Sequence, residues 1–288
     1  MGTKDISEKY LESYNDVFAD IINVLLFQGK NLIEPEQLEN DTTTNVYKAD
    51  GELHEEERDI SKYWSKGNVR FAIYGIENQS DIHPFMPLRV IGYDGPSYRE
   101  QLLSGAQKKK YPVITIVLYF GTDKRWERPK QLSDCLDIPD ELRPYFKDYG
   151  INVFEIAYLP DETIQKFRSD FRIVADYFSQ IRKNNDYQPS NEEITHVDAV
   201  LKLMSVMTGD KRFEEVQKTG ESEVHTMCEL LDRIEQQGIQ QGMQQGEINL
   251  ANAIRRLCSG ETKEQLIASG LDARTVDLAL TLQMSIPM

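Results

Sequence analysis

The most apolar segment of the chain is a short run at residues 112–120, with the sequence PVITIVLYF. Its β-branched and aromatic residues favour a strand, and a run of this length is typical of a strand buried on both faces. A membrane-spanning helix needs roughly 18 or more apolar residues in succession, and the sequence contains no such run. We therefore expect a globular protein without a membrane span, in which this segment is a core strand.

Other segments supply partners for this strand. Residues 69–76 alternate as in a strand, with Val69, Phe71 and Ile73 on one side, and lead directly into Glu77. The remaining expected elements are strands at 58–64 and 153–159, helices at 7–28 and 86–106, and a polar, irregular segment at 30–56. This order of helices and strands predicts an α/β domain around a mixed sheet.

The second half of the chain is expected to be helical. Apolar residues recur at helical spacing after residue 161, and further helices are expected at about 192–208 and 221–259. The last of these contains Gln-Gln-Gly three times between 236 and 246, which favours a flexible, polar helical linker, since each glycine costs a helix roughly 1 kcal/mol.

The chain ends in a pattern typical of two short helices at residues 262–280, where Thr262 and Gln265 can form a capping box. We predict three parts: an α/β core at 1–160, a helical region at 161–235 that packs on the core, and the Gln-Gly helix with the terminal helical pair at 236–288.

The net charge of −15 argues against nucleic acid as a partner, because affinity for phosphates comes largely from Lys and Arg. The distribution of the charge changes this interpretation. Residues 58–130 contain 13 Lys and Arg against 7 Asp and Glu, so an otherwise acidic chain has a basic middle. Such a segment permits a local surface for nucleic acid, although a solvated face is the commoner explanation.

The cysteines and histidines argue against several classes of site. The three cysteines lie far apart, and none has the paired spacing of a zinc knuckle or a redox motif. The four histidines are scattered, without the spacing of a metal site. The sequence also lacks a phosphate-binding Gly-rich loop, a fingerprint for an organic cofactor and an apolar signal region. We expect a cytoplasmic protein without an organic cofactor.

Two carboxylates can meet if the strands at 58–64 and 69–76 form a hairpin. Asp59 and Glu77 then lie at one end of the sheet, and converging carboxylates are hard oxygen ligands that suit Mg²⁺ or Mn²⁺. Gln79 lies two residues after Glu77 and therefore on the same side of the strand. A divalent cation held there can stabilise charge on a phosphodiester and activate a water. Surface carboxylates at strand ends are the alternative explanation of this short pattern.

Four short motifs, together with their context, resemble one family. They are FADIIN at 18–23, RDI at 58–60, GIENQS at 75–80 and MPLRVIGYD at 86–94. Tyr98 and Gln101 continue the last motif, and residues 112–120 with Trp126 match the strand that follows. On these motifs the chain resembles the recombination-promoting nuclease (Rpn) and putative transposase family, in the PD-(D/E)XK nuclease superfamily. The polar C-terminal helix with repeated Gln-Gly is also typical of that family.

The resemblance implies an α/β, PD-(D/E)XK restriction-endonuclease-like core, with a mixed central sheet flanked by helices, and a helical C-terminal region. It also implies metal-dependent DNA cleavage, with Asp59 and Glu77 as metal-binding acids and Gln79 in the position usually held by Lys. The backbone carbonyl of Asn78 would be a further ligand. A third acid would come from the first helix, where Asp20 or Asp16 is the candidate.

Candidate DNA contacts lie in the basic middle of the chain. Arg89 follows Glu77 on the next expected helix, where it faces either DNA or the core. Lys108, Lys109 and Lys110 form an exposed basic run that can touch phosphates, although a solvated turn before the core strand is the simpler interpretation.

We therefore predict an Mg²⁺- or Mn²⁺-dependent DNA endonuclease that promotes recombination or transposition, and double-strand cutting would favour a homodimer. The alternative is a nuclease-fold protein that is catalytically weak or inactive and acts through interactions. Three features motivate this alternative: Gln79 in place of Lys, the net charge of −15, and a long polar C-terminal half.

Overall fold

A computed structural model describes most of the chain as two compact units. The described residues are 11–41, 44–49, 52–57, 59–67, 69–103, 109–209, 212–213 and 225–284. The first unit is Met1–Cys228 and the second is Glu229–Met288. The structure thus divides the chain once, after Cys228, whereas the sequence pattern predicted three parts.

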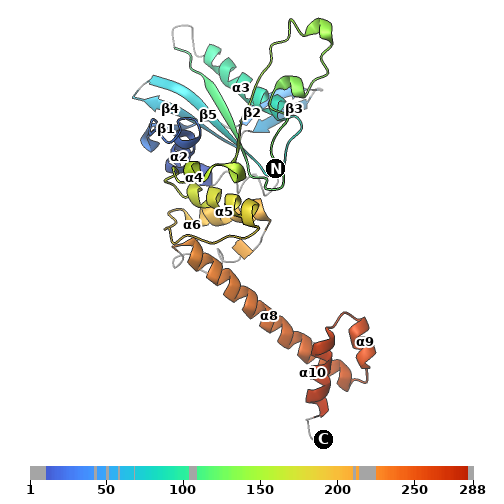
Figure 1. The fold of residues 1–288 in the computed structure, drawn as a ribbon. Helices are drawn as coiled ribbons and strands as arrows, with labels where there is room; N and C mark the ends of the chain where they lie inside the picture. The colour runs from blue at the N-terminus through green and yellow to red at the C-terminus, as the bar shows by residue number, and fades with distance from the viewer. Residues whose placement is uncertain are drawn as a thin grey trace. The chain divides into compact units, whose positions relative to one another are not determined.

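A five-stranded sheet forms the centre of the first unit, in the order β1-β4-β5-β6-β7. Figure 1 labels three of its strands, β1, β4 and β5. Its strands are β1 (Leu38–Asn40), β4 (Ile60–Lys66), β5 (Val69–Gln79), β6 (Val113–Tyr119) and β7 (Asn152–Glu155). The pairs β1–β4 and β4–β5 are antiparallel, whereas β6 and β7 run parallel to β5. The predicted α/β fold with a mixed sheet is therefore confirmed.

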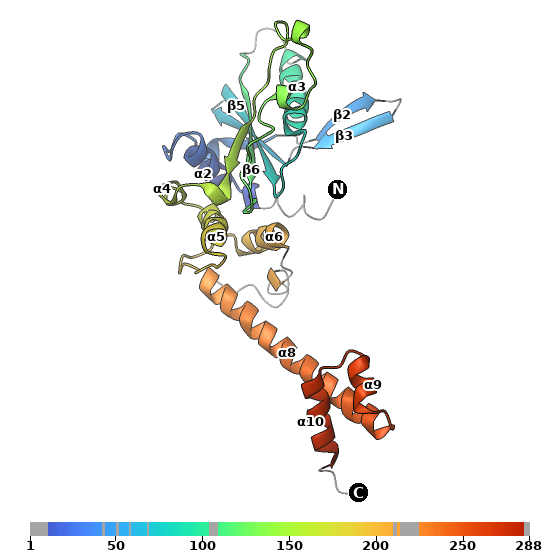
Figure 2. The same cartoon turned by 45° about the vertical axis from the view of Figure 1, so that its right-hand side comes forward.

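Two helices, α2 (Asn15–Leu25) and α3 (Met86–Leu103), cover opposite faces of this sheet (Figure 2). The Lys62 ammonium of β4 lies 5.6 Å from the centroid of the Phe18 ring of α2. The Thr115 hydroxyl of β6 donates a hydrogen bond of 2.6 Å to the Asp94 carboxylate of α3. Because side chains alternate along a strand, these contacts assign alternate residues of β4, β5 and β6 to the α2 face and to the α3 face.

The segment expected to be irregular, residues 30–56, contains strands. β1 lies within it, and β2 (Thr44–Ala49) pairs with β3 (Glu52–Glu57) in a separate two-stranded sheet. This prediction was wrong because the sequence ELHEEE of β3 carries no local strand preference. Pairing with a neighbouring strand, which the local sequence does not reveal, produces these strands.

Other boundaries moved by a few residues. The strand expected from residue 58 begins at Ile60, and Arg58 lies outside the described residues. Residues 7–10 of the first expected helix and 104–106 of the helix after Glu77 also lie outside them. The latter helix, α3, continues through Pro96 to Leu103.

The first unit continues with helices, as predicted. They are α4 (Asp161–Ile164), α5 (Phe171–Asn184) and α6 (Val197–Thr208). Phe171 and Phe178 of α5 pack on Phe120, which follows β6, with ring centroids 6.3 and 5.2 Å apart. These contacts join the helical region to the end of the central strand.

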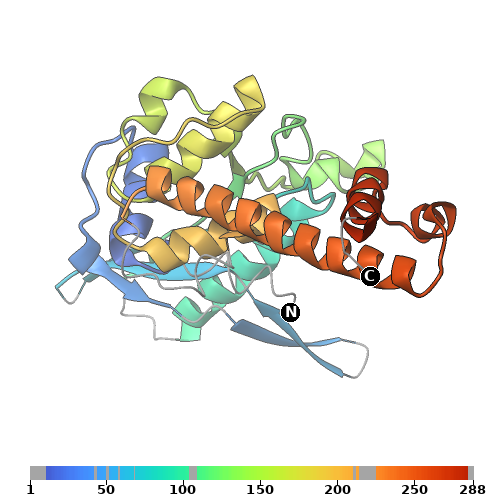
Figure 3. The ribbon, with the colours of Figure 1, turned by 90° about the horizontal axis from the view of Figure 1, so that it is seen from below.

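The second unit contains most of α8 (Met227–Cys258), with α9 (Lys263–Ala268) and α10 (Ala273–Met284) folded back on its end (Figure 3). The predicted helical pair is confirmed, and so is its capping box, in which Thr262 accepts from the Gln265 backbone. α8 is continuous through the three Gln-Gln-Gly repeats. Among the described helices, none is long and apolar enough to cross a membrane.

Lys62 is a charged residue in the core, with 1% of its surface exposed. Its ammonium donates hydrogen bonds to the Ser13 carbonyl at 2.8 Å and to the side-chain oxygens of Asn15 and Asn40 at 2.7 and 2.6 Å. These bonds tie the start of α2 to β1 and β4. Burial lowers the pKa of Lys62 from 10.5 to about 8.

The stability of the protein should therefore rise with pH in alkaline solution through Lys62. Between pH 8 and 10.5 the folded state binds fewer protons at this group than the unfolded state, so the cost of burying the charge disappears as pH rises. Measured by urea denaturation, the free energy of unfolding of the wild type should gain up to about 3 kcal/mol over that of Lys62→Met across this window. A difference that stays constant with pH would contradict this account.

Candidate active site

The pairing of β4 with β5 brings two acids together. Ile60, the first residue of β4, lies opposite Ile76, so Asp59 just before Ile60 and Glu77 just after Ile76 come next to each other. Residues opposite each other in an antiparallel ladder share a face, so both carboxylates lie on the α3 face where β4 begins. Asp59 is 8% exposed and Glu77 is fully buried. We call these two residues the carboxylate pair.

Backbone donors hold the carboxylate pair in place. The N–H of Asp59 donates to Glu77 Oε1 at 3.2 Å, and the N–H of Asn78 donates to Asp59 Oδ2 at 2.7 Å. Each acid therefore accepts a hydrogen bond from the strand that carries the other. These bonds offset part of the cost of burying two negative charges side by side.

The backbone of Asn78 points toward the carboxylate pair. The N–H of Ile73 donates to the carbonyl of Pro112, just before β6, and the carbonyl of Gln79 accepts from the N–H of Phe120, just after β6. In a parallel ladder alternate residues bond to the same neighbour, so the odd-numbered residues of β5 bond to β6. The N–H and carbonyl of Asn78 consequently point toward β4. Its side chain lies on the α2 face, where its amide atoms have no hydrogen-bond partner among the described residues.

Arg89 of α3 contacts the carboxylate pair. Its Nη2 lies 3.3 Å from Glu77 Oε2 and donates to the Tyr93 hydroxyl at 2.9 Å. Burial works to lower the pKa of Arg89, but the carboxylate of Glu77 and the neighbouring Tyr93 outweigh it, so the pKa is raised. Arg89 is therefore a permanent positive charge beside the pair, and its side chain is still 33% exposed.

His83 lies in the turn just before α3. Its Nδ1 accepts the backbone N–H of Phe85 at 3.2 Å. Partial burial, together with the positive charge of Arg89, lowers the pKa of His83, so the neutral ring is favoured near pH 7. Its position next to the site comes from the turn that joins β5 to α3.

Gln79 lies on the same face as Glu77 and is partly exposed. In the part of the chain that the structure describes, its side-chain amide makes no hydrogen bond. The amide is therefore available to a water or a phosphate oxygen near the carboxylate pair, but it supplies no charge.

The two candidate acids of the first helix contact other parts of the chain. Asp20 Oδ2 accepts from the backbone N–H groups of Arg168 and Ser169 at 2.8 Å each, and from the Ser169 hydroxyl at 2.7 Å. Asp16 Oδ2 lies 3.0 Å from His196 Nε2. The structure therefore does not bring either acid to the carboxylate pair, and Asp20 instead holds the turn that leads into α5.

The donor set at the carboxylate pair fits a small hard cation. Mg²⁺ is commonly held in proteins by one or two carboxylates and several waters. Asp59 and Glu77 supply the carboxylates, and the carbonyl of Asn78 points to the same side. Within the described residues, no three His, Cys, Asp or Glu side chains converge, so water would have to complete the shell.

Two of the three lysines predicted to contact DNA lie at the other end of the sheet. Lys109 and Lys110 precede β6, whereas Glu77 lies opposite Val117 near the end of that strand. At about 3.3 Å per residue, the distance along β6 from Lys110 to Val117, the residue opposite Glu77, is roughly 20 Å. Lys110 also donates to the backbone carbonyl of Gln101. Lys108 lies outside the described residues.

A different set of basic residues follows β6, at the end of the sheet that bears the carboxylate pair, and the sequence pattern did not single them out. The loop after β6 is anchored by Trp126, which is fully buried and packs in one cluster with Met86 at the start of α3. This anchor holds Lys124, Arg125 and Arg128, all exposed, at the end of the sheet that bears Glu77. The sequence indicated them only through the excess of Lys and Arg over Asp and Glu in residues 58–130.

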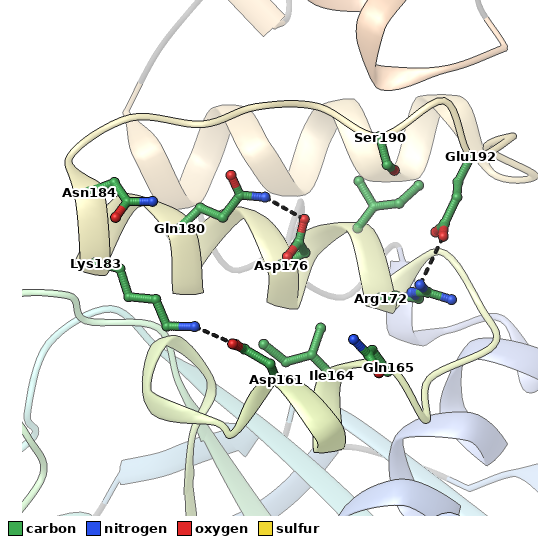
Figure 4. A pocket seen from close by; sticks show the side chains of 11 residues that line it. Asp161, Ile164, Gln165, Arg172, Asp176, Gln180, Lys183, Asn184, Ser190 and Glu192 are labelled. Atoms are coloured by element: carbon green, nitrogen blue, oxygen red, sulfur yellow. Dashed lines mark hydrogen bonds and ion pairs between the residues drawn. The ribbon is translucent and has the colours of Figure 1, made fainter.

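A polar pocket of about 410 Å³ lies elsewhere in the first unit, along α4 and α5 (Figure 4). Two ion pairs span it, Arg172 with Glu192 at 3.0 Å and Lys183 with Asp161. None of its lining residues belongs to β4, β5 or α3, and its bases are paired with its own acids. The pocket is therefore separate from the carboxylate pair.

Comparison with known proteins gives one match. A family model described as "Putative transposase, YhgA-like" matches residues 50–206, which is more than half of the chain and includes Asp59, Glu77, Gln79 and Arg89. No curated protein and no solved structure matches the chain significantly.

The contacts of Asp20 predict a structural phenotype. Asp20→Ala removes three hydrogen bonds to one carboxylate oxygen and should lower the free energy of unfolding by about 2 kcal/mol, measured by chemical denaturation. Asp16→Ala loses one contact with His196, made by a half-exposed carboxylate, and should lower the free energy of unfolding by less than about 1 kcal/mol. If the carboxylate pair binds a divalent cation, the binding measured by calorimetry should persist in Asp20→Ala, and its selective loss from a folded variant would show that Asp20 is a ligand.

Proposed function

The chain belongs to the family described as "Putative transposase, YhgA-like", and on this premise we propose that it is a divalent-metal-dependent DNA endonuclease with a PD-(D/E)XK core. Its role would be to cut DNA during recombination or transposition. The observation that supports this proposal most directly is the carboxylate pair, which is buried, held by backbone donors and bordered by Arg89.

Each residue of the site has a defined task in this proposal. Asp59 and Glu77 would hold Mg²⁺ or Mn²⁺, with the carbonyl of Asn78 as a further ligand. The cation, when bound, would stabilise charge on the phosphodiester and lower the pKa of a water. Gln79 would orient that water through its amide. Arg89 would contact a phosphate oxygen through its partly exposed guanidinium.

The surface around the pair fits a nucleic-acid backbone. Lys124, Arg125 and Arg128 are exposed at the same end of the sheet, and such side chains give affinity through phosphate contacts. Arg125 and Arg128 each lie 3.7 Å from an acid, and Lys124 is exposed as well. Cleavage of both DNA strands would further favour a homodimer.

A second candidate is a nuclease-fold protein with little or no activity. The observation that favours it is that both acids already accept backbone hydrogen bonds, and Glu77 also contacts Arg89. A pair satisfied in this way is stable without a cation. Cleavage by the folded wild type decides between the two functions.

Plasmid cleavage with Mg²⁺ tests the proposed activity. Asp59→Ala and Glu77→Gln should each lower the rate about 100-fold or more, because each removes a cation ligand. Gln79→Ala should retain part of the activity, because it removes only a polar contact. Asp81→Asn, which changes an exposed acid just after β5, is the matched control and should cleave like the wild type. Equal rates in all four variants would refute the assignment, and an inactive, folded wild type would favour the second candidate.

The position of the DNA surface can be tested with two lysines. Lys124→Ala should weaken DNA binding several-fold and lower the slope of log affinity against log salt by about one unit. Lys109→Ala, at the opposite end of the sheet, should leave both unchanged. Fluorescence anisotropy with a labelled duplex at several salt concentrations measures both quantities. If Lys109→Ala weakened binding and Lys124→Ala did not, the DNA-binding surface would lie at the segment before β6 instead.

A further inference from the structure

We propose that Arg89 competes with the divalent cation for Glu77, holding this carboxylate in the cation-free protein and turning to a DNA phosphate once a cation is bound. This inference rests on the proposed metal-dependent function. It assigns to Arg89 a positioning role that is distinct from a fixed structural ion pair.

The contact that carries the inference is between Arg89 Nη2 and Glu77 Oε2, at 3.3 Å. Glu77 is fully buried, so its charge depends on nearby donors and cations. Its other oxygen accepts the N–H of Asp59 at 3.2 Å. A divalent cation bound to Glu77 would therefore lie within a few ångströms of the guanidinium, and the two positive charges would repel each other.

A second contact shows how Arg89 can leave Glu77 without losing its place. The Tyr93 hydroxyl accepts from Arg89 Nη2 at 2.9 Å and from Nε at 3.3 Å. Tyr93 is 2% exposed and lies one helical turn after Arg89, so it is a fixed anchor. Guanidinium has five N–H donors, and the ones not used by Tyr93 remain for a phosphate oxygen.

The exposure of Arg89 agrees with this second position. One third of its side chain is open to solvent, although its partner Glu77 is closed off. The other titratable group next to it, His83, is biased toward its neutral form by burial and by the charge of Arg89. Arg89 is thus the described cation that both touches the carboxylate pair and reaches the surface.

The inference makes a prediction of opposite sign to that of a residue that orients Glu77 for the cation. If Arg89 only maintained the site, its removal would weaken cation binding. If Arg89 competes with the cation, its removal should tighten cation binding while weakening DNA binding.

Calorimetric titration of Mn²⁺ into the full chain tests this prediction. Arg89→Ala should bind Mn²⁺ about tenfold more tightly than the wild type. Without cation it should melt several degrees lower, and saturating Mn²⁺ should close part of this gap. Arg99→Ala, an exposed base on the same helix, is the matched control and should change neither quantity. Arg89→Lys keeps the positive charge but loses the planar set of guanidinium N–H donors, so its affinity for Mn²⁺ should lie between those of the wild type and Arg89→Ala. It provides the same comparison if Arg89→Ala does not fold.

The outcomes separate this inference from the proposed function. If Glu77→Gln abolishes Mn²⁺ binding but Arg89→Ala binds Mn²⁺ no more tightly than the wild type, the competition is refuted and the metal site stands. If neither the wild type nor Arg89→Ala binds Mn²⁺, both proposals are refuted. Binding by Arg89→Ala that exceeds that of the wild type and is lost on adding Glu77→Gln supports both.

Discussion

The burial of two carboxylates side by side is the constraint on which the rest of the site depends. Asp59 and Glu77 are almost entirely removed from water, and two adjacent carboxylates repel each other when both are ionised. The cross-strand hydrogen bonds and the contact with Arg89 reduce this cost, but an apolar pair would avoid it altogether. Packing alone would favour apolar side chains at these two positions, and the proposed function rests on this difference.

The position of Arg89 follows from how α3 is attached to β6. The Tyr98 hydroxyl accepts the N–H of Val113 at 3.1 Å, and the Gln101 amide bonds both backbone groups of Tyr111. With the bond from Thr115 to α3, these contacts fix the C-terminal half of the helix on the sheet. The N-terminal half is held by the apolar cluster that includes Trp126. A helix attached at both ends presents Arg89 to the carboxylate pair in a defined orientation.

The strands with strong apolar patterns were predictable, and so was the meeting of Asp59 with Glu77. A hairpin that joins consecutive strands brings their ends together, and period-two alternation then assigns the face. The polar strands β1, β2 and β3 were not predictable, because cross-strand pairing forms them against weak local preference. Buried Lys62 was missed for a similar reason, since Lys is usually exposed and only the assembled fold brings its three acceptors together.

The sequence by itself determined the class of fold, the central strands and the two acids, because these depend on residue types and on short-range spacing. The tertiary structure decided which other groups join those acids. It directed Asp20 to Ser169, nearly 150 residues away, and Lys110 to the far end of the sheet. It also brought Arg89 against Glu77. Such contacts depend on how helices pack on the sheet, which spacing along the chain does not encode, and they surround the carboxylate pair with groups that its own two strands do not supply.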